Sequence, residues 1–490
     1  MITQKKALFF GMIPKELQDR ISKLPEESQL LLELVVSLFT DEIDKLNLRI
    51  KELEDQLSKN SNNSSKPPST DEFKKVPKSL KPKTGKKAGG QKGHSGETLK
   101  MSSQVDDVVE HKVEICKNCN KNLRHQFVDY VEKRQVYDIP EIKIGITEHQ
   151  SEVKKCACGC VNKAFPKGVD YKVQYGPNIK STIVYLQDYQ LLPYDRTTEL
   201  IRDLFNHSIS KGSLYNFREK AFEKLESFEE RLKSILSLSL VSGFDETGFR
   251  INKKRWWLHS CSTDELVYYA VHPKRGQLAM DEIGILPLFK GIAVHDFWKS
   301  YYKYDCEHSL CNAHLLRDLI FIKERFNQKW ADELINLLLK LLNLKNKALA
   351  RGQKAISYIT IKKYELQYDK IVKKGLRQNP YKPPLEKKRG RKKKTPPRNL
   401  LERFKDYKVD ILRFFNDFKV PFDNNFSERD IRMMKVKQKI SGCFRSVKGA
   451  QFFARTRSYI MTARKQNINV FNALKSLFTD NSIALTLLQN

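Results

Sequence analysis

The sequence predicts a multidomain α+β protein, and three observations lead to this expectation. A length of 490 residues suggests about three domains. Short β-branched and aromatic runs gather between 238 and 294, as they do in a sheet. Helical patterns lie on either side, with a heptad repeat at 32–57 and a leucine-rich stretch at 331–368. We therefore expect helical parts on both sides of one mixed α/β core.

The composition points to a nucleic-acid partner. A formal charge of +32 and a pI near 9.6 favour a polyanionic ligand, nucleic acid before a membrane surface. No apolar run approaches the roughly 18–20 residues that span a bilayer, and the N-terminus lacks the features of a secretory signal. Five of the nine cysteines stand in two tight groups, which is not the pattern of a disulfide framework. We expect a cytoplasmic, DNA-facing protein without a membrane partner.

Residues 1–60 are expected to form a helical coiled coil. Apolar residues recur there in alternating steps of four and three, and charged residues fill the other faces. The seam consists of Leu32, Val36, Phe39, Ile43, Leu46, Ile50, Leu53 and Leu57. A seam this narrow favours self-association into a homodimer or a higher homo-oligomer. The alternative is an amphipathic helix that packs on the protein's own body.

Residues 61–100 lack the apolar side chains that a core needs. The segment is rich in Ser, Asn, Pro and Gly, and it has ten lysines against three acidic residues. It is either a solvated flexible linker or a basic tether that lies along DNA phosphates, and the two interpretations are compatible.

A zinc-binding module is predicted at 101–165. Cys116 and Cys119 form a Cys-x-x-Cys pair, a spacing typical of structural zinc sites. The later group, CACGC, is compressed, and we assign Cys156 and Cys158 to the metal, with the last cysteine of the group as the substitute. Four thiolates around one Zn²⁺ can hold together a module that has little core of its own. A redox pair and metal-free thiols are the alternatives.

Two short helices with a polar break between them are expected within 166–230. DRTTELIRDLF precedes the break and KGSLYNFREKAFEKL follows it, with Ser210 placed to cap the second helix. This order resembles a helix-turn-helix, whose second helix, at about 211–220, would enter a major groove. Lys211 and Arg218 of that helix are candidate DNA contacts. Two adjacent helices joined by a turn are common, however, so the pattern alone does not establish DNA binding.

Three acids stand out among the 58 acidic residues because of their surroundings. Asp245 ends an apolar run that we interpret as a strand, and Asp296 ends a second short run. Glu428 lies early in a helix that opens at DNN, residues of good N-cap type. Two acids at strand ends and a third on a helix are the ligand set of a two-Mg²⁺ phosphodiester-cleaving site. Taken singly, each acid could instead be a surface charge or a helix cap.

Several motifs of this chain occur together in one known protein family. They are FDETGFRI, GIAVHDFWKSYY followed by HSLCNAHLLRDL, DNNFSERDIRMMKVKQKISGCFRS and RSYIMTARKQNINVFNAL. Upstream, NSSKPPSTD and KTGKKAGGQKGHSG match as well. In these motifs the chain resembles the bacterial DDE transposases of the insertion sequence sixty-six family. The resemblance covers most of the chain, with independent motifs in the right order.

The resemblance implies an RNase H-like α/β core that cleaves and joins DNA with two Mg²⁺ ions, for which Mn²⁺ can substitute. Matching the motifs places the catalytic, metal-binding triad on Asp245, Asp296 and Glu428. The spacing from the second acid to the third is too long for a minimal core, and it implies a helical insertion, which the family also has. The expected parts are the first and second segments of the core, the insertion with its basic loop, and a C-terminal tail, at 231–325, 408–470, 326–407 and 471–490 respectively.

The segment that follows Glu428 is expected to form a DNA-facing wall. From Glu428 to Lys465 the chain has eleven basic residues and only two acids. The candidate contacts to the DNA backbone are Arg429, Arg432, Lys435, Arg445, Lys448 and Arg455. An ion pair between Glu428 and Arg432, four residues apart on a helix, is the alternative account of those two residues.

Cys311 and His314 form a Cys-x-x-His pair on one helix face, and the family carries such a pair here too. No second well-spaced pair completes a tetrahedron, so we expect a structural role beside the active site, with metal binding as the alternative.

The expected function is transposition of an insertion sequence. Hydrolysis would free a 3′-hydroxyl at each element end, and that hydroxyl would then attack target DNA. The partners would be the terminal repeats, target DNA and further copies of the chain, with accessory proteins of the same element as further candidates. The place of action would be the bacterial cytoplasm, with the protein on the nucleoid when bound to DNA. The alternatives are a catalytically inactive DNA-binding regulator and an RNase H-like nuclease or resolvase that cuts without joining.

Overall fold

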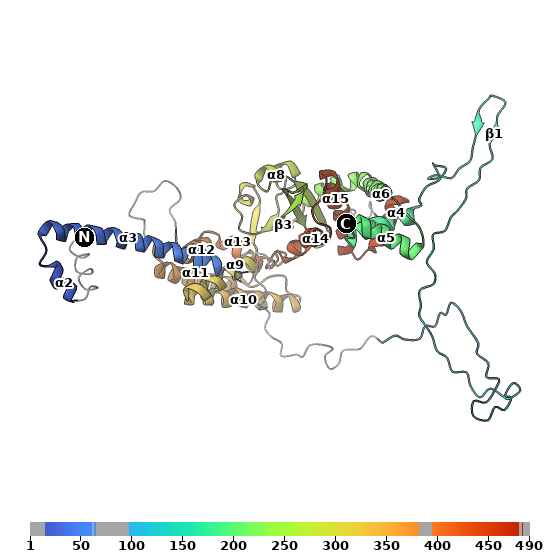
Figure 1. Cartoon of the computed structure of the whole chain (residues 1–490), viewed down its shortest axis with the longest axis horizontal. Coiled ribbons are helices and arrows are strands. Elements are labelled where there is room, and N and C mark those ends of the chain that lie inside the picture. The colour runs from blue at the N-terminus through green and yellow to red at the C-terminus, as the bar shows by residue number, and fades with distance from the viewer. Residues whose placement is uncertain (1–14, 61–62, 65–97, 382–393, 480–482, 484–490) are drawn as a thin grey trace. The chain divides into compact units, whose positions relative to one another are not determined.

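The computed structural model of the chain describes residues 15–60, 63–64, 98–381, 394–479 and 483 (Figure 1). The expected linker lies largely outside the described residues, and so does most of the expected basic loop of the insertion. Two units can be distinguished. The larger comprises 1–78, 177–191 and 217–490, and the smaller comprises 79–176 and 192–216.

Two helices open the described chain, α2 (Lys15–Ile21) and the long α3 (Glu26–Leu57) (Figure 1). The helix predicted from the heptad pattern is confirmed. Most of the seam stays open to solvent, since Phe39 is 66% exposed and Leu46 is 56% exposed. Self-association through this seam remains a prediction.

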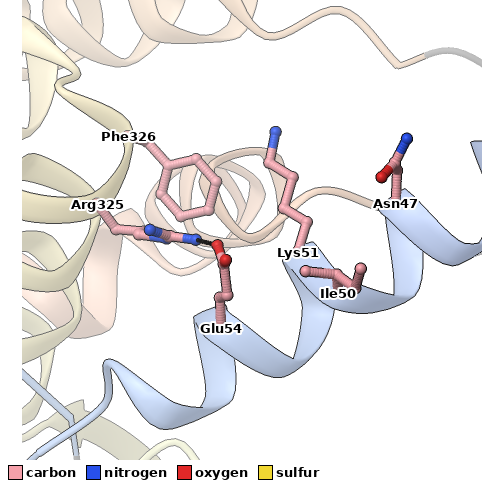
Figure 2. Close-up of a pocket in the computed structure, with 6 residues that line it drawn as sticks. All are labelled: Asn47, Ile50, Lys51, Glu54, Arg325 and Phe326. Carbon is pink, nitrogen blue, oxygen red and sulfur yellow. Dashed lines mark hydrogen bonds and ion pairs between the residues drawn. The ribbon is translucent and has the colours of Figure 1, made fainter.

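The C-terminal end of α3 lies against α9 (Asn312–Phe326). The Arg325 guanidinium donates to the carboxylates of Glu54 and Asp55, both at 2.7 Å. Figure 2 shows Arg325 reaching Glu54 beside a hollow that the seam residue Ile50 also lines. At this end, therefore, the helix does pack on the protein's own body, which was the alternative to a coiled coil, whereas the rest of the seam does not.

The cysteine-rich segment 98–176 has little regular structure. Two short antiparallel strands, β1 (Lys154–Lys155) and β2 (Val161–Asn162), are described within it. None of its residues is buried, and Phe127 is 99% exposed. The segment therefore builds no apolar core of its own.

The expected pair of short helices is confirmed as α5 (Tyr194–Phe205) and α6 (Lys211–Lys224). Ser210 Oγ accepts a hydrogen bond from the Ser213 N–H at 3.0 Å, so it caps α6 as predicted. The helix is longer than expected, and from Phe217 onward it belongs to the larger unit. The helix-turn-helix interpretation of these helices stays a prediction.

A mixed five-stranded sheet organises the larger unit, in the order β5-β4-β3-β6-β7. The strands are β3 (Val241–Ile251), β4 (Lys254–Ser262), β5 (Val267–His272), β6 (Ile292–His295) and β7 (Glu307–Leu310). The first three form antiparallel hairpins, whereas β6 and β7 run parallel to β3. The four strands expected between 238 and 294 are thus confirmed.

One expectation about the sheet is wrong, because Asp245 does not end its strand. It lies in the middle of β3, which continues to Ile251 and pairs with β4 from Gly243 onward. Asn252 and Lys253 both have positive φ and make a tight two-residue turn, so the hairpin closes late. The apolar run before Asp245 marked only the first half of the strand.

Two helices from the end of the chain pack on the antiparallel part of the sheet, α14 (Asn425–Ser441) and α15 (Val447–Lys465) (Figure 1). Their buried apolar side chains, such as Met434 and Phe453, meet Phe249 of β3 in one core. The remaining elements of this unit outside the insertion are α4 (Pro177–Val184), η2 (Tyr185–Tyr189), α7 (Glu226–Ser237), α8 (Gln277–Ile283), η3 (Tyr301–Lys303) and α16 (Val470–Phe478).

The segment between Asp296 and Glu428 does contain the expected helical insertion. Its leucine-rich part forms two helices rather than one, with a break in which Gly352 has positive φ. Trp330, Tyr368 and Phe404 are fully buried and join these helices in a second core. The helices after α9 are α10 (Lys329–Ala350), α11 (Tyr358–Gln378), α12 (Pro396–Asp406) and α13 (Lys408–Asn416). No helix among the described residues has the length and apolarity needed to cross a membrane.

Candidate active site

Asp245 and Asp296 come from neighbouring parallel strands. Gly243 of β3 pairs with Val294 of β6. Each acid lies two residues further along its own strand direction, so the two reach the same level and point to the same face. Asp296 follows the end of β6 directly, as predicted.

Glu428 reaches this edge because α14 begins directly against β3. A Cβ atom at Gly243 would come within 2.2 Å of Ser427 Oγ and 2.4 Å of Asn424 Oδ1, so only glycine permits the approach. The Asn424 side-chain amide donates to the Phe244 carbonyl at 2.8 Å and fixes the start of the helix. Glu428 follows in the first turn, as predicted.

The electrostatics of Asp245 indicate that the three acids converge. Burial raises the pKa of Asp245 well above its usual range, and the charges of Glu246, Glu428 and Asp296 raise it further. The hydrogen bond from the Glu246 N–H, at 2.8 Å, acts in the opposite direction. Like charges shift one another's pKa only at short range, so the strand and helix acids share one space.

Three clustered carboxylates suit Mg²⁺, which prefers hard oxygen ligands and relieves the repulsion among them. Their oxygens do not all lie within the distance that ligands of a single ion require. In the described part of the chain, the one group of three ligand side chains at such spacing is Cys311, His314 and Glu428. A site for two ions divides the acids between the ions and does not need that spacing.

Glu246 is a fourth acid of this region, and it was not among the predicted site residues. Its side chain is 1% exposed and pairs with Arg275 at 2.5 Å. The Tyr301 hydroxyl donates to its other oxygen at 2.5 Å. Arg275 lies over the ring of Trp298 at 4.2 Å, and Trp298 is two residues after Asp296. Glu246 thus ties β3 to the loop that carries Asp296, and its place beside Asp245 in the DET motif was the available signal.

The imidazole of His295 is engaged inside the protein. It stacks on Tyr301 with ring centroids 4.5 Å apart, and its Nε2 lies 3.0 Å from His308 Nδ1.

Asp296 itself accepts a hydrogen bond from the Trp298 N–H at 2.9 Å, which orients the carboxylate.

The side chains nearest to Glu428 come from α9. Glu428 Oε1 lies 3.5 Å from His314 Nδ1 and 4.0 Å from Cys311 Sγ, and its Oε2 lies 4.0 Å from the Arg317 guanidinium. Glu428 therefore pairs across to α9 rather than with Arg432 along its own helix. Burial raises the pKa of Cys311 to about 12, so its thiol is neutral when no cation is bound.

The candidate DNA contacts differ in their accessibility. Arg429, Arg432 and Arg445 are exposed. Lys211 and Lys448 are exposed but pair with the carboxylates of Asp195 and Glu219, and the Lys435 amine donates to the Gly248 carbonyl. All of these side chains remain near solvent.

Two of the predicted DNA contacts face inward instead. Arg218 is 5% exposed and makes a bidentate pair with Asp188, with nitrogen–oxygen distances of 2.7–3.1 Å. Arg455 pairs with Glu229 at 2.5 Å, and its guanidinium lies 3.7 Å from the Phe222 ring centre. Arg218 was predicted from the second helix of the helix-turn-helix and Arg455 from the basic segment after Glu428, but partner acids and an aromatic ring hold both side chains inside. We therefore withdraw both as contacts to DNA.

The predicted zinc ligands form two separate pairs. Backbone N–H groups and the partner thiol lower the pKa of Cys116 in the first pair and of Cys156 in the second. The four thiols do not meet at ligand distance in this structure, and Cys119 and Cys158 are exposed. No buried apolar residue lies between the two cysteine pairs. Apolar packing therefore does not bring the four thiols together.

Comparisons with known proteins identify the family. A family model described as Transposase IS66 family matches residues 172–452, more than half of the chain. A second model, for a family of unknown function, DUF6444, matches residues 13–100. A search of curated proteins gave no match. The matched range contains all three acids, both sheet halves and the helical insertion. The chain thus belongs to the IS66 family of transposases.

Proposed function

We propose that this protein is a DDE transposase that binds the ends of an insertion sequence, cleaves them and joins them to target DNA. The observation that carries the proposal is the convergence of Asp245, Asp296 and Glu428 from two neighbouring strands and the helix packed on them. Membership in a transposase family supports a role in transposition. The proposal adds the chemistry and the residues.

An RNase H-like core is part of the proposal. An antiparallel three-stranded meander that continues into two parallel strands, in the order β5-β4-β3-β6-β7, supports it. The first acid in the middle of the first strand and the second acid after the fourth strand agree with this assignment.

The acids would hold two Mg²⁺ ions, or Mn²⁺ in their place. The ions would supply charge neutralisation at the attacking and leaving oxygens of the phosphodiester. The chain's own contribution is position. Gly243 admits α14 to the strand, Asn424 fixes the first turn, and the pair of Arg275 with the buried Glu246 braces the loop of Asp296.

The surrounding parts would serve DNA binding and assembly. The exposed basic side chains beside α14 would contact phosphates, and α5 with the start of α6 would act as a helix-turn-helix. We assign a structural Zn²⁺ to Cys116, Cys119, Cys156 and Cys158, and backbone N–H groups favour the thiolates of Cys116 and Cys156. The open seam of α3 would pair with a second copy of the chain. The protein would act in the cytoplasm, on nucleoid DNA.

A strand-transfer assay tests the proposal. Purified full-length protein is incubated with end-labelled DNA carrying the repeats that flank its gene, a plasmid target, and Mg²⁺ or Mn²⁺. Asp296→Asn is assayed in parallel. Asp264→Asn serves as the matched control, because Asp264 is an exposed acid in the turn between β4 and β5. Joined products with the unmodified chain and the control, and none with Asp296→Asn, are expected.

Other outcomes separate the alternatives. Tight DNA binding without cleavage under either metal would favour the inactive regulator. Metal-dependent cutting without joined products would favour a nuclease or resolvase. Strand transfer retained by Asp296→Asn would overturn the assignment of that acid.

A further inference from the structure

The side chains beside Glu428 form a cluster of ligand atoms that the acid triad does not use. Cys311 is the N-cap residue of α9, and His314 lies in the first turn of that helix. Cys311 Sγ, His314 Nδ1 and a Glu428 carboxylate oxygen all lie within 4.8 Å of one another. Two helices distant in sequence, α9 and α14, therefore bring a thiol, an imidazole and a carboxylate to one point.

One atom of this cluster is left without a partner. His314 Nδ1 is buried and makes no hydrogen bond with any described residue. Its nearest acceptor, Glu428 Oε1 at 3.5 Å, is too far for a hydrogen bond of ordinary length. A buried imidazole nitrogen without a partner is costly, and a cation between it and the carboxylate would satisfy both groups.

The sulfur of Cys311 is already held in place on one side. The Asn424 N–H donates to Cys311 Sγ at 3.2 Å, and this same residue fixes the start of α14. A backbone donor of this kind stabilises a thiolate that binds a metal ion. The same sulfur lies 4.0 Å from Glu428 Oε1.

The spacing of the three atoms fits a tetrahedral ion. Zn–S bonds of about 2.3 Å and Zn–N or Zn–O bonds of about 2.0–2.1 Å place tetrahedral ligands roughly 3.3–3.7 Å apart. The distances from Glu428 Oε1 are 3.5 Å to the nitrogen and 4.0 Å to the sulfur, so little movement is needed. A ligand set with sulfur and imidazole selects Zn²⁺-like ions over Mg²⁺.

We propose that Cys311, His314 and Glu428 form a binding site for one Zn²⁺-class ion, which shares only Glu428 with the site of the Mg²⁺ ions. The ion would fasten α9 to α14, the helices on either side of the insertion. It would bind Glu428 through Oε1 and leave Oε2, which faces Arg317, to the acid triad. The catalytic meaning of Glu428 rests on the proposed function, whereas the ion site rests on these contacts alone.

Cobalt binding tests the site without any DNA chemistry. The full-length chain first has Cys116, Cys119, Cys156, Cys158 and Cys160 replaced by Ser, which removes the other clustered thiols. In this background, Co²⁺ as a probe is expected to give a thiolate-to-cobalt charge-transfer band, which Co²⁺ bound to carboxylates alone does not give. Cys311→Ser should lose the band. Cys306→Ser, which changes a half-buried cysteine outside the cluster, should retain it.

Further variants guard against misfolding of the buried Cys311→Ser change. Glu428 and His314 are partly exposed, so Glu428→Gln and His314→Ala should fold. Each is expected to weaken Co²⁺ binding by about tenfold or more. A band that persists in Cys311→Ser, or unchanged Co²⁺ affinity in both other variants, would overturn the proposal. Cobalt binding without strand transfer would count against the proposed function only, and strand transfer without cobalt binding would count against this site only.

Discussion

Around the five-stranded sheet, Tyr269 and Phe453 are almost fully enclosed, whereas between 98 and 176 no residue is buried. Both regions contain large apolar side chains, since the second includes Phe127, Tyr130 and Ile146. The difference is that the first has helices to lay over its apolar faces. Packing therefore fixes the positions of the acids. The cysteine pairs lack a packed core, so their arrangement depends on another source of folding energy.

This difference can be tested because all four tryptophans lie in the larger unit, at 256, 257, 298 and 330. Tryptophan fluorescence during urea unfolding then reports on the larger unit alone. Changes inside the packed region should alter it, and changes in the cysteine-rich segment should not.

The largest effect on the larger unit is expected from Asp188→Asn. Asp188 is fully buried and is the acid that pairs with Arg218, with Lys437 and Arg457 close by. Loss of its charge leaves these cations buried with too little compensation. The free energy of unfolding should fall by about 3–5 kcal/mol.

The matched control for that prediction is Asp305→Asn. Asp305 pairs with Lys290 at the surface of the same unit, where both side chains are more than half exposed. It should change stability far less than Asp188→Asn does. Similar values for the two variants would show that the buried pair is not what holds α6 to η2.

A smaller loss is expected from Gly243→Ala. The new methyl group would press on Ser427 and Asn424 at the start of α14, so the helix must shift and carry Glu428 away from Asp245. Overpacking of this kind costs about 1–3 kcal/mol. Metal-dependent DNA cleavage should fall far more than stability does.

Gly248→Ala on the same strand provides the comparison. Its added methyl group would meet Trp257 at 3.5 Å, an ordinary contact. Fluorescence-monitored unfolding and the cleavage assay should give values near those of the unmodified chain. Equal loss of cleavage in both variants would argue that Gly243 does not position Glu428.

The sequence predicted where the strands and the helix of Glu428 lie in this packed region. It did not predict the full length of every strand. Apolar runs located the strands and DNN located the start of α14, because both signals are local. The length of β3 was missed, since the pairing of Arg250 with Arg255 is decided by the turn at Asn252 and Lys253 and not by apolar residues.

A local sequence pattern could not predict ion pairs between side chains from distant segments of the chain. Arg218 was predicted as a DNA contact from the helix-turn-helix pattern and Arg455 from its basic neighbours. Their acids, Asp188 and Glu229, lie 30 and 226 residues away. Glu246 was missed for the same reason, as its partner Arg275 comes from after β5.

Asp245→Asn should stabilise the metal-free protein at neutral pH. Because the pKa of Asp245 is raised in the folded state, its charged form opposes folding. The unmodified chain should lose stability as pH rises from the ordinary carboxyl range toward the raised pKa of Asp245, and the amide variant should lose less. The measurement is the fluorescence melting temperature against pH in a chelator. Added Mg²⁺ should narrow the gap, and a variant less stable than the unmodified chain at neutral pH would contradict this account.

The smallest effect on the larger unit is expected from Cys156→Ser. This exposed thiol touches none of the packed core, so the fluorescence-detected free energy of unfolding should stay within about 0.5 kcal/mol. For residues 98–176 a large effect of this variant on limited proteolysis is expected, because a four-thiolate site supplies the folding energy that packing does not. Zn²⁺ should protect this segment in the unmodified chain and in Cys443→Ser, another exposed cysteine, and fail to protect it in Cys156→Ser. If Zn²⁺ protects all three proteins equally, the segment is ordered by other means, and the contrast between a packed unit and a metal-dependent one does not hold.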